Sequence, residues 1–414
     1  MSPESATVVG RGPAGLMAAT LLAAGGVSVH LVAAAAGSLA LWSGRMDFRG
    51  WDGGEPVANP WEWWGQHGAE HMDGGDSLGR WSRVWALWGA LARELGVGAA
   101  VPAANRWAPT PLGHRRPVFW APPWELALES GPASLSSAAV VGFTGFPDFD
   151  AELAADGFPA SVAVDTAWLP KPPGWSPSWT ALRYAAYFDT EPGADWLSQQ
   201  LLGAVGPLAP ELVVVPQVLG IEHTGALWRR LERLLERPVR EVGLTPPGVG
   251  GMRIERRWMR WLLASGVHLH HGRVQSLYDA GGVWLGDGRR AGTGPVILAT
   301  GGFLGGGLHL RPNGRAEDPV LRRTVGHLGE TDSADTILRW GLAIGDPPAC
   351  GRQVAGCDPD ADGDGGAMCL WTAASAVDRV APELVDRLQR IGQEPISIIS
   401  HFGDNGGREE ALHG

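Results

Sequence analysis

The amino-acid sequence predicts an α/β fold made of two domains, one inserted into the other. A short apolar strand at residues 7–9 runs into a glycine-rich turn and a helix, and a second apolar strand follows at 27–32. A new succession of strands and helices begins at 138, and apolar strand segments resume after it. With 414 residues, the chain is long enough for this arrangement. We expect a discontinuous domain at 1–137 and 246–381, an inserted α/β domain at 138–245, and a weakly ordered tail at 382–414.

The turn after the first strand has the glycine spacing of a nucleotide-binding site. Gly10 permits a tight turn, Gly12 lets backbone approach a phosphate, and Gly15 lets the helix pack closely on the strand. The helix N-terminus offers free N–H groups and a positive dipole end to an anion. We therefore predict a Rossmann-like domain, the alternative being a plain glycine turn in an alanine-rich α/β protein. The residues expected at a cofactor are Gly10, Gly12, Pro13, Ala14 and Gly15.

One part of the usual dinucleotide pattern is missing at the end of the second strand. Dinucleotide sites place Asp or Glu there to accept hydrogen bonds from the adenosine ribose, but residues 33–36 are all alanine. The next carboxylate along the chain is Asp47, and no basic residue follows the strand directly to hold the 2′-phosphate of NADP. Either other groups hold the ribose, or the ligand is a mononucleotide such as FMN.

Composition excludes several classes of function. The net charge of -11 and the isoelectric point near 5.5 argue against a nucleic-acid partner. Lys171 is the only lysine, so a Schiff base or a P-loop has one candidate and no motif around it. The three cysteines, Cys350, Cys357 and Cys369, fit a reducing cytoplasm and are expected to be small buried hydrophobes. No run of about 20 uncharged apolar residues indicates a membrane-spanning helix.

The remaining elements follow from the spacing of apolar residues. In the first part of the chain the pattern predicts a long loop at 51–72, a helix at 79–95 whose tryptophans belong to the core, and irregular chain at 102–132. In the inserted domain it predicts strands at 138–143 and 212–215 and helices at 151–156 and 224–235. A helix beginning near Arg253 precedes a segment at 267–270, and strands at 282–285 and 295–299 are expected to return to the first sheet.

Two further segments indicate a flavin nucleotide. The strand at 296–299 ends in Thr300, Gly301 and Gly302, which brings small residues and backbone close to a ligand. The segment at 350–359, which includes Asp358, leads to a glycine run at 363–366 that opens a helix ending near 380. A helix that opens on Gly365 and Gly366 suits the pyrimidine edge of a flavin, where reduction places negative charge. Asp364 departs from this pattern, because a carboxylate there opposes an anionic flavin unless its side chain points to solvent.

With these three segments, the chain resembles flavoproteins of the fumarate reductase/succinate dehydrogenase type. More narrowly, it is similar to the B subunits of the bacterial anaerobic glycerol-3-phosphate dehydrogenases. The glycine turn and the Ala-Thr-Gly strand end are shared by many flavoproteins, whereas the middle segments are more specific. Together the matching stretches cover most of residues 5–380. They are residues 10–16, 42–47, 110–113, 140–145 with 148–149, 244–247 with Gly250, 299–308, and 358–359 with the following glycines.

The resemblance implies an enzyme that oxidises sn-glycerol 3-phosphate to dihydroxyacetone phosphate and passes electrons toward the quinone pool. It also implies an A-type subunit as catalytic partner, an iron–sulfur C-type subunit as membrane anchor, and a place in the cytoplasm on the inner face of the membrane. In this family the B-type subunit is associated with FMN, with FAD as the alternative. Carried over by position, the residues around the flavin would be Gly10, Gly12, Gly15, Ser43, Gly44, Thr300, Gly301, Gly365 and Gly366.

The residues that would act on the substrate are less clear from sequence. Flavin-dependent alcohol oxidation needs a base for the hydroxyl proton and cations for the substrate phosphate. Arg352 is the preferred phosphate ligand, because it lies inside a cofactor segment, and His309 is a candidate base. The weaker candidates are His223, His268, His270, His271, Arg253, Arg311 and Arg315. Two alternatives remain, namely a stand-alone flavin-dependent reductase or dehydrogenase of the fumarate reductase type and a flavin-free scaffold subunit.

Overall fold

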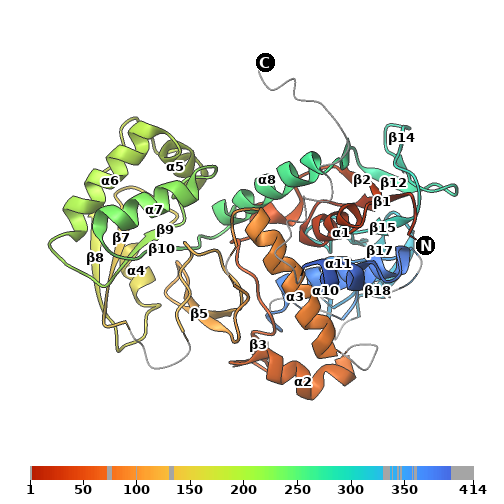
Figure 1. Cartoon of the computed structure of the whole chain (residues 1–414), viewed down its shortest axis with the longest axis horizontal. Helices are drawn as coiled ribbons and strands as arrows, with labels where there is room; N and C mark the ends of the chain where they lie inside the picture. The colour runs from red at the N-terminus through yellow and green to blue at the C-terminus, as the bar shows by residue number, and fades with distance from the viewer. Residues whose placement is uncertain are drawn as a thin grey trace.

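In the computed structural model the chain forms two lobes joined by a narrower waist (Figure 1). The structure describes residues 2–71, 77–129 except 99, 135–329, and 336–392 except 338, 343, 344, 346, 357, 359 and 360. The inserted lobe contains the elements from β7 (Ser137–Phe143) to β10 (Val239–Val242). The first lobe contains the elements before and after them, and α8 (Val249–Ala264) leads the chain back into it.

The first lobe is built on a parallel sheet with the order β11-β2-β1-β15. Strand β1 (Ser5–Val9) pairs on one side with β2 (Ser28–Ala33) and on the other with β15 (Val296–Leu298), while β11 (His268–His271) lies at the edge beside β2. Helix α1 (Pro13–Ala24) connects β1 to β2. This βαβ unit confirms the predicted Rossmann-like α/β fold.

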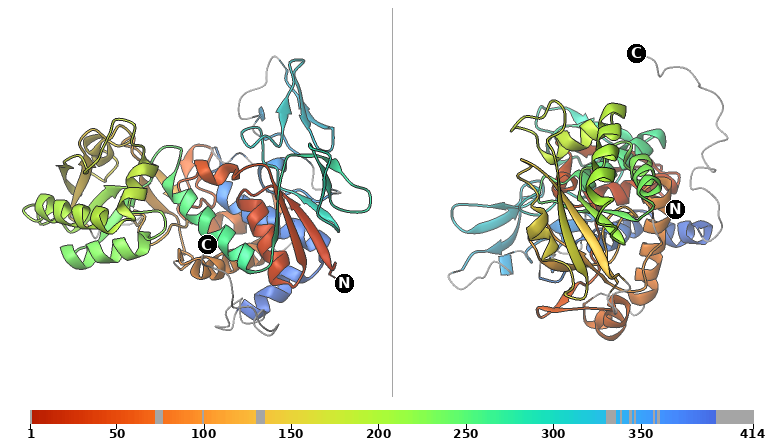
Figure 2. Two further views of the ribbon diagram at one scale, coloured as in Figure 1. Left: turned by 90° about the horizontal axis from the view of Figure 1, so that it is seen from above. Right: turned by 90° about the vertical axis from the view of Figure 1, so that its left-hand side faces the viewer.

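Backbone at 348–350 extends the sheet beyond β15. The Leu298 N–H donates to Pro348 O at 2.9 Å, and the Cys350 N–H donates to Leu298 O at 2.8 Å. One face of the sheet packs on a core that includes side chains of α1, α8, α10 (Gly365–Val380) and the helix at residues 77–94. The other face packs on a small antiparallel sheet of β12 (Val274–Leu277), β13 (Val283–Leu285) and β14 (Arg290–Ala291). Figure 2 shows this region projecting from the first lobe.

The inserted lobe has its own parallel sheet, in the order β10-β9-β7-β8. Strands β8 (Ala163–Leu169) and β9 (Leu212–Pro216) lie on opposite sides of β7. Backbone at 124–126 adds a further strand beside β10, because the Leu126 N–H donates to Glu241 O at 2.8 Å and the Glu241 N–H donates to Trp124 O at 2.7 Å. The helices of this lobe are α4 (Ala151–Ala155), α5 (Ala181–Phe188), α6 (Glu191–Val205) and α7 (Thr224–Leu235).

The other elements complete the first lobe. Between β2 and the inserted lobe lie η1 (Gly37–Leu41), β3 (Trp51–Asp52), β4 (Glu55–Pro56), α2 (Pro60–His71), α3 (Ser77–Glu94), β5 (Arg106–Pro109) and β6 (Arg115–Val118). After β15 come β16 (His309–Leu310), β17 (Arg315–Asp318), β18 (Arg323–His327), η2 (Gly351–Gln353), α10 and α11 (Leu384–Gly392).

Several sequence-based expectations need correction. Residues 51–72 hold helix α2 and a short hairpin rather than a long loop, and 102–132 hold the β5–β6 hairpin rather than irregular chain. Strand β13 pairs with β12 and β14 rather than returning to the first sheet. The tail expected from 382 begins instead with helix α11, whose Leu384 and Val385 are buried in the first core.

Tryptophan side chains make up much of the core of the first lobe. Trp81, Trp85 and Trp88 of α3 are buried, as the spacing in the sequence predicted. The Trp81 ring lies 4.4 Å from the ring of Trp371 on α10, measured between centroids. These contacts hold α3 against α10, which in turn packs on α1 beside the glycine turn. Among the helices of the described ranges, none is long and apolar enough to cross a membrane.

Candidate functional site

The glycine turn after β1 is fixed by close contact with the end of β15. Gly10 has a φ of +110°, and a Cβ there would overlap the carbonyl of Ala299. A Cβ at Gly15 would overlap the carbonyl of Gly10, so the helix can approach the strand only with glycine at this position. The Ala299 N–H donates to Val9 O at 2.7 Å. Gly10 and Gly15 therefore serve the packing of strand, turn and helix.

Gly12 is in a different situation, because the space beside it is open. It is the N-cap of α1 with a φ of −77°, and the only atom within 4 Å of a Cβ there, among the described residues, would be Ser38 Oγ at 3.5 Å. Gly12 has no side chain that could cap this end of α1, and the first turn of the helix contains no acidic residue. A helix N-terminus with an open approach is the expected environment for a phosphate.

The segment after β15 lies beside this turn. Gly301 has a φ of +85°, and the Thr300 N–H donates to the amide oxygen of Gln353 at 3.2 Å. Gln353 is fully buried, and its own amide N–H donates to the buried carboxylate of Asp318. Within the part of the chain that the structure describes, the buried Thr300 Oγ1 has no hydrogen-bond partner. An unpartnered buried hydroxyl at this position is consistent with a polar ligand.

The C-terminal segment predicted to bind the cofactor meets the same turn through η2 and α10. A Cβ at Gly351 would lie 2.8 Å from the Ala14 side chain, and a Cβ at Gly302 would lie 3.2 Å from Arg352 O. The Ala14 N–H at the start of α1 donates to the Cys369 thiol. Burial raises the pKa of Cys369 to about 11, so the thiol is neutral at neutral pH.

The cysteines fit the structural role predicted for them in the described part of the chain. Cys350 and Cys369 are buried and free of disulfides, and burial raises the pKa of both thiols. A thiol held neutral is a poor nucleophile. Cys357 lies outside the described residues.

The amino-terminal end of α10 fits an anion less well than that of α1. A Cβ at Gly366 would lie 3.0 Å from the Met46 side chain, and the Ala367 N–H already donates to Asp47 O at 3.0 Å. Asp364 does not point to solvent, since it is 3% exposed and accepts a hydrogen bond from the Arg49 backbone N–H. Burial raises the pKa of Asp364 to about 7, which keeps much of this carboxyl neutral at neutral pH.

Asp358 and Arg49 organise the chain before α10. The Asp358 carboxylate accepts from the Ala361 N–H at 3.2 Å and is 1% exposed. The Arg49 guanidinium lies 3.0 Å from Asp52, 3.3 Å from Asp362 and 3.6 Å from Asp364, and it stacks on Trp63 at 3.8 Å. Asp358 therefore shapes a turn of the cofactor segment.

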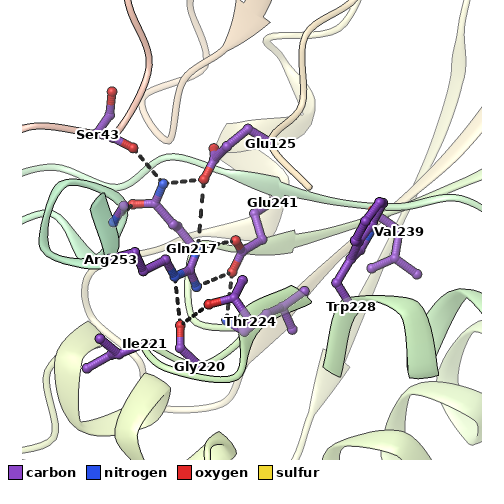
Figure 3. Close-up of polar contacts among 12 residues, drawn as sticks. Ser43, Glu125, Gln217, Gly220, Ile221, Thr224, Trp228, Val239, Glu241 and Arg253 are labelled. Atoms are coloured by element: carbon purple, nitrogen blue, oxygen red, sulfur yellow. Dashed lines mark hydrogen bonds and ion pairs between the residues drawn. The ribbon is translucent and has the colours of Figure 1, made fainter. Parts of the chain in front are cut away.

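Ser43 lies at the junction between the two lobes, against Gln217 of the inserted lobe (Figure 3), and Gly44 follows it in the chain. A Cβ at Gly44 would lie 3.0 Å from the backbone of Gly250 at the start of α8. The Gln217 amide, which follows β9 of the inserted lobe, donates to Ser43 O at 2.8 Å and accepts from the Gly250 N–H at 2.9 Å. Of the predicted cofactor residues, Ser43 is thus held by the inserted lobe, whereas Gly44 packs on α8.

A buried network of charged and polar side chains surrounds this contact. It consists of Arg45, Glu125, Gln217, Glu241 and Arg253, each at most 7% exposed, and we call it the junction network. Arg45 donates to Glu125 at 3.1 and 3.2 Å. Arg253 donates to the two oxygens of Glu241 at 2.5 and 3.0 Å (Figure 3). Gln217 donates to the other oxygen of Glu125. Burial raises the pKa of Glu125 to about 7.

The junction network removes one of the candidate phosphate ligands. Besides the two bonds to Glu241, the Arg253 guanidinium donates through Nε to Gly220 O at 2.7 Å. Its side chain is 1% exposed. Arg253 was a wrong candidate, because its donors are already used inside the protein.

The other candidates for phosphate or proton binding are spread over both lobes. Arg311 and Arg315 both bind Glu317, and His309 Nε2 lies 3.5 Å from Arg273 Nη2. Arg352 does lie beside Gly302, in the cofactor segment. His268 and His270 lie on the edge strand β11, His271 ends that strand, and the backbone of His223 binds Asp189. The structure assigns a base to none of them.

Sequence reasoning missed His30 and three acids or amides of the junction network. His30 Nδ1 lies 3.0 Å from His270 Nε2 on the neighbouring strand, and burial together with His270 and His268 lowers the pKa of His30. For Glu125 and Glu241 a signal did exist, because each interrupts an apolar strand segment with a charge. Nothing local to Gln217 indicates its contacts.

An open hollow of about 420 Å³ lies at the opposite end of the first sheet from the glycine turn. Pro295 and Val296, at the amino end of β15, contribute to its wall. Its other lining residues are Leu277, Tyr278, Asp279, Gly281, Gly294, Leu321, Arg323, Pro347 and Pro348. This hollow is separate from the segments predicted to bind a cofactor.

Comparison with known proteins gives a consistent set of relatives. The B subunit of anaerobic glycerol-3-phosphate dehydrogenase from Yersinia enterocolitica is 25% identical over 329 residues, which cover 69% of this chain and 74% of the relative. The corresponding protein from Vibrio cholerae is 24% identical over 322 residues, which cover 67% of this chain and 72% of the relative. These relatives confirm the resemblance seen in the sequence. No protein-family model matches the chain.

Solved structures match only loosely. Iminodiacetate oxidase from Chelativorans sp. BNC1 gives a TM-score of 0.26 at 16% identity, covering 73% of this chain and 58% of that one. Xcc4156, a flavin-dependent halogenase from Xanthomonas campestris, gives 0.29 at 11% identity, covering 97% of this chain and 77% of that one. Both TM-scores are low, so the description of the site depends on this chain's own geometry.

Proposed function

We propose that the chain is a flavin-binding oxidoreductase subunit that takes part in the oxidation of sn-glycerol 3-phosphate to dihydroxyacetone phosphate, the reaction that its resemblance to the B subunits implies. One observation carries the proposal. The glycine turn, the Thr300 segment and η2 meet at the carboxyl edge of one parallel sheet, although they lie far apart in the sequence. Ligands of open α/β sheets bind at this edge. The similarity to the B subunits supports the same conclusion.

The residues at the amino end of α1 fit a flavin phosphate. The open space beside Gly12 at the helix end would receive the phosphate, and the unpartnered hydroxyl of Thr300 would bind a polar group of the ligand. A bound flavin would supply the hydride acceptor for alcohol oxidation. Around it we propose Gly10, Gly12, Pro13, Ala14, Gly15, Ser43, Gly44, Thr300, Gly301, Gly302, Asp358, Gly365 and Gly366 as the cofactor residues.

FMN is the flavin that the local structure favours. No carboxylate follows β2, and the chain turns instead into η1. A Cβ at Gly37 would lie 3.0 Å from Gly12 N, so η1 packs directly on the glycine turn on this side. A mononucleotide does not need the space and the ribose ligand that an adenosine half requires. FAD remains the alternative outcome of the test below.

The catalytic role that we propose is a shared one. Arg253, Arg311 and Arg315 are engaged by Glu241 or Glu317 in the structure. We keep Arg352 as the phosphate candidate because it lies beside Gly302, next to the Thr300 segment. We propose that this chain passes electrons from the substrate toward the quinone pool together with an A-type catalytic subunit and an iron–sulfur C-type subunit. Its place would then be the inner face of the cell membrane, held there by the partner.

The experiment that tests this function starts with the purified full chain. Its visible spectrum is recorded, and any flavin is released by denaturation and identified by chromatography. Glycerol 3-phosphate oxidation is then measured with an artificial electron acceptor, for the chain alone and after mixing with an A-type subunit. FMN in the chain, and activity that requires the A-type subunit, are the expected results.

Each other outcome has a definite meaning. FAD would shift the proposal toward the broader fumarate reductase group, and strong activity of the isolated chain would refute the shared role. A colourless chain that takes up neither flavin would favour the flavin-free scaffold. One observation favours the flavin-free scaffold. At the amino-terminal ends of α1 and α10, the Ala14 N–H and the Ala367 N–H already donate to Cys369 and to Asp47 O.

A further inference from the structure

Gln217 is the one side chain of the inserted lobe that bonds directly to Ser43 in the described structure. Its Nε2 donates to Ser43 O at 2.8 Å and to Glu125 Oε1, and its Oε1 accepts from the Gly250 N–H at 2.9 Å. The residue is fully buried, so water cannot replace these bonds. One amide therefore holds the Ser43 turn and the start of α8 at the same time (Figure 3).

We propose that Gln217 is a positioning residue for the flavin site, through its bond to the Ser43 carbonyl. The inference rests on the proposed function, which places Ser43 and Gly44 beside the flavin. Gly44 has a φ of +85° and packs on the Gly250 backbone, so its own conformation is restricted. The conformation of the rest of the turn depends on the hydrogen bond at Ser43 O. If that bond is lost, the turn presents its backbone to the ligand in a different conformation.

The charges around Gln217 explain why an amide is needed at this position. Glu125, from the segment beside β10, faces Arg45 of the first lobe, and Glu241 of β10 faces Arg253 of α8. Arg253 Nη1 also lies 3.9 Å from Glu125 Oε1. Two cations thus meet two carboxylates, and a third carboxylate at position 217 would leave a buried negative charge without a partner. Only an amide can donate to Ser43 O and Glu125 while accepting from Gly250.

The test uses an isosteric change and a matched control. Gln217→Glu removes both N–H donors but keeps the acceptor for Gly250, and Gln199→Glu makes the same change at an exposed position of α6. The measurements are the dissociation constant for FMN, by fluorescence quenching, and amide hydrogen exchange at residues 42–46 in the flavin-free chain. For Gln217→Glu we expect the dissociation constant to rise on the order of tenfold and the exchange at 42–46 to become faster. Gln199→Glu should change neither.

A double variant separates positioning from a general loss of stability, and it also serves if Gln217→Glu does not fold. Glu125→Gln combined with Gln217→Glu exchanges the two groups, so that the amide and the carboxylate again face each other. We expect the urea midpoint to recover toward that of the native chain, while the FMN dissociation constant stays raised because Ser43 O still lacks its donor.

Two results would overturn the inference. One is a folded Gln217→Glu chain with native FMN affinity and native exchange at 42–46, and the other is an exchanged double variant in which affinity recovers together with stability. Failure of the proposed function is recognised separately and first. In that case the native chain itself binds neither FMN nor FAD, and the positioning role falls with it.

Discussion

Gly10 and Gly12 belong to one glycine turn but have different physical tasks. Gly10 has a positive φ and faces the Ala299 carbonyl, so its missing side chain is needed for folding. Gly12 has an ordinary backbone conformation and faces open space. Two substitutions of the same kind can therefore separate folding from binding at this turn.

We expect Gly10→Ala to destabilise the fold by about 2–4 kcal/mol, because the added methyl group meets backbone in a strained conformation. We expect Gly12→Ala to change stability by less than about 0.5 kcal/mol but to weaken FMN binding by about tenfold or more, since the methyl group stands where a phosphate approaches. Urea unfolding and FMN titration of both variants check this. Native FMN affinity in folded Gly12→Ala would argue against a phosphate at this helix end.

Asp364 makes the stability of the fold depend on pH. Its pKa is 3.8 in an ordinary environment, and burial raises it to about 7 in the folded chain. The folded state therefore binds the proton more tightly, so the contribution to stability is full below pH 3.8 and is lost as the pH rises through about 7.

We expect Asp364→Asn to remove this contribution to the pH dependence. Between pH 5 and pH 8 the free energy of unfolding of the native chain should fall relative to that of the variant by roughly 2.5–3 kcal/mol, at about 1.4 kcal/mol per pKa unit. Urea unfolding at several pH values measures the difference. Asp165→Asn, at an exposed position of β8, is the matched control and should show no such trend. Parallel curves for the native chain and Asp364→Asn would contradict the raised pKa.

At the scale of single elements, α11 is part of the first core. Leu384 is 1% exposed and lies against Gly25 at the end of α1, where a Cβ would overlap its methyl groups. The Arg80 guanidinium of α3 also stacks on Trp371 of α10, at 5.1 Å from the ring centroid. The helices α1, α3, α10 and α11 thus form one packed group behind the glycine turn.

We expect Leu384→Ala to lower the free energy of unfolding by about 2–5 kcal/mol, through lost burial and the cavity that remains. The control is Leu263→Ala on α8, where the side chain is 49% exposed and the cost should stay below about 0.5 kcal/mol. Chemical unfolding followed by tryptophan fluorescence measures both. Equal costs for the two variants would mean that α11 does not pack as described.

Local elements were predictable from the sequence and distant pairings were not. Strand β1, helix α1 and strand β2 follow each other, and their apolar spacing identified them. Helix α2 was missed because Gly65 and Gly68 weaken its helical pattern, although the structure uses both glycines to bring α3 close, next to Leu78 and Ser77. For β13 the pattern indicated a strand correctly, but its partners could not be read from it.

At the candidate site, too, local features could be predicted from the sequence, whereas contacts between distant residues could not. The three glycine-containing segments were found because the turn that each needs leaves a trace in its own sequence. The junction network was not found, because Arg45, Glu125 and Glu241 come from distant parts of the chain and meet only in the folded protein. A charged residue in an apolar strand indicates that a hydrogen-bond or ion-pair partner exists, but it does not indicate which part of the chain supplies that partner.

At the scale of the whole molecule, the junction network couples the two lobes. Arg253 lies on α8 of the first lobe, and Glu241 lies on β10 of the inserted lobe. We expect Arg253→Met to destabilise the chain by about 3–5 kcal/mol, because it leaves the carboxylate of Glu241 buried without its partner. Unfolding in urea, followed by both circular dichroism and tryptophan fluorescence, should then show two transitions. A single transition with unchanged midpoint would argue against coupling through this pair.

The pairing of β1 with β15 has a consequence for the synthesis of the protein on the ribosome. The Thr7 hydroxyl of β1 donates to Thr293 O, 286 residues further along the chain, whereas all four strands of the inserted lobe lie within 137–242. At about 5–20 residues per second, the growing chain has a complete inserted lobe well before β15 emerges, roughly 15–60 s after β1. During that interval one edge of β1 has no partner strand, so the nascent chain is most exposed to aggregation and to chaperones before the proposed flavin site has formed.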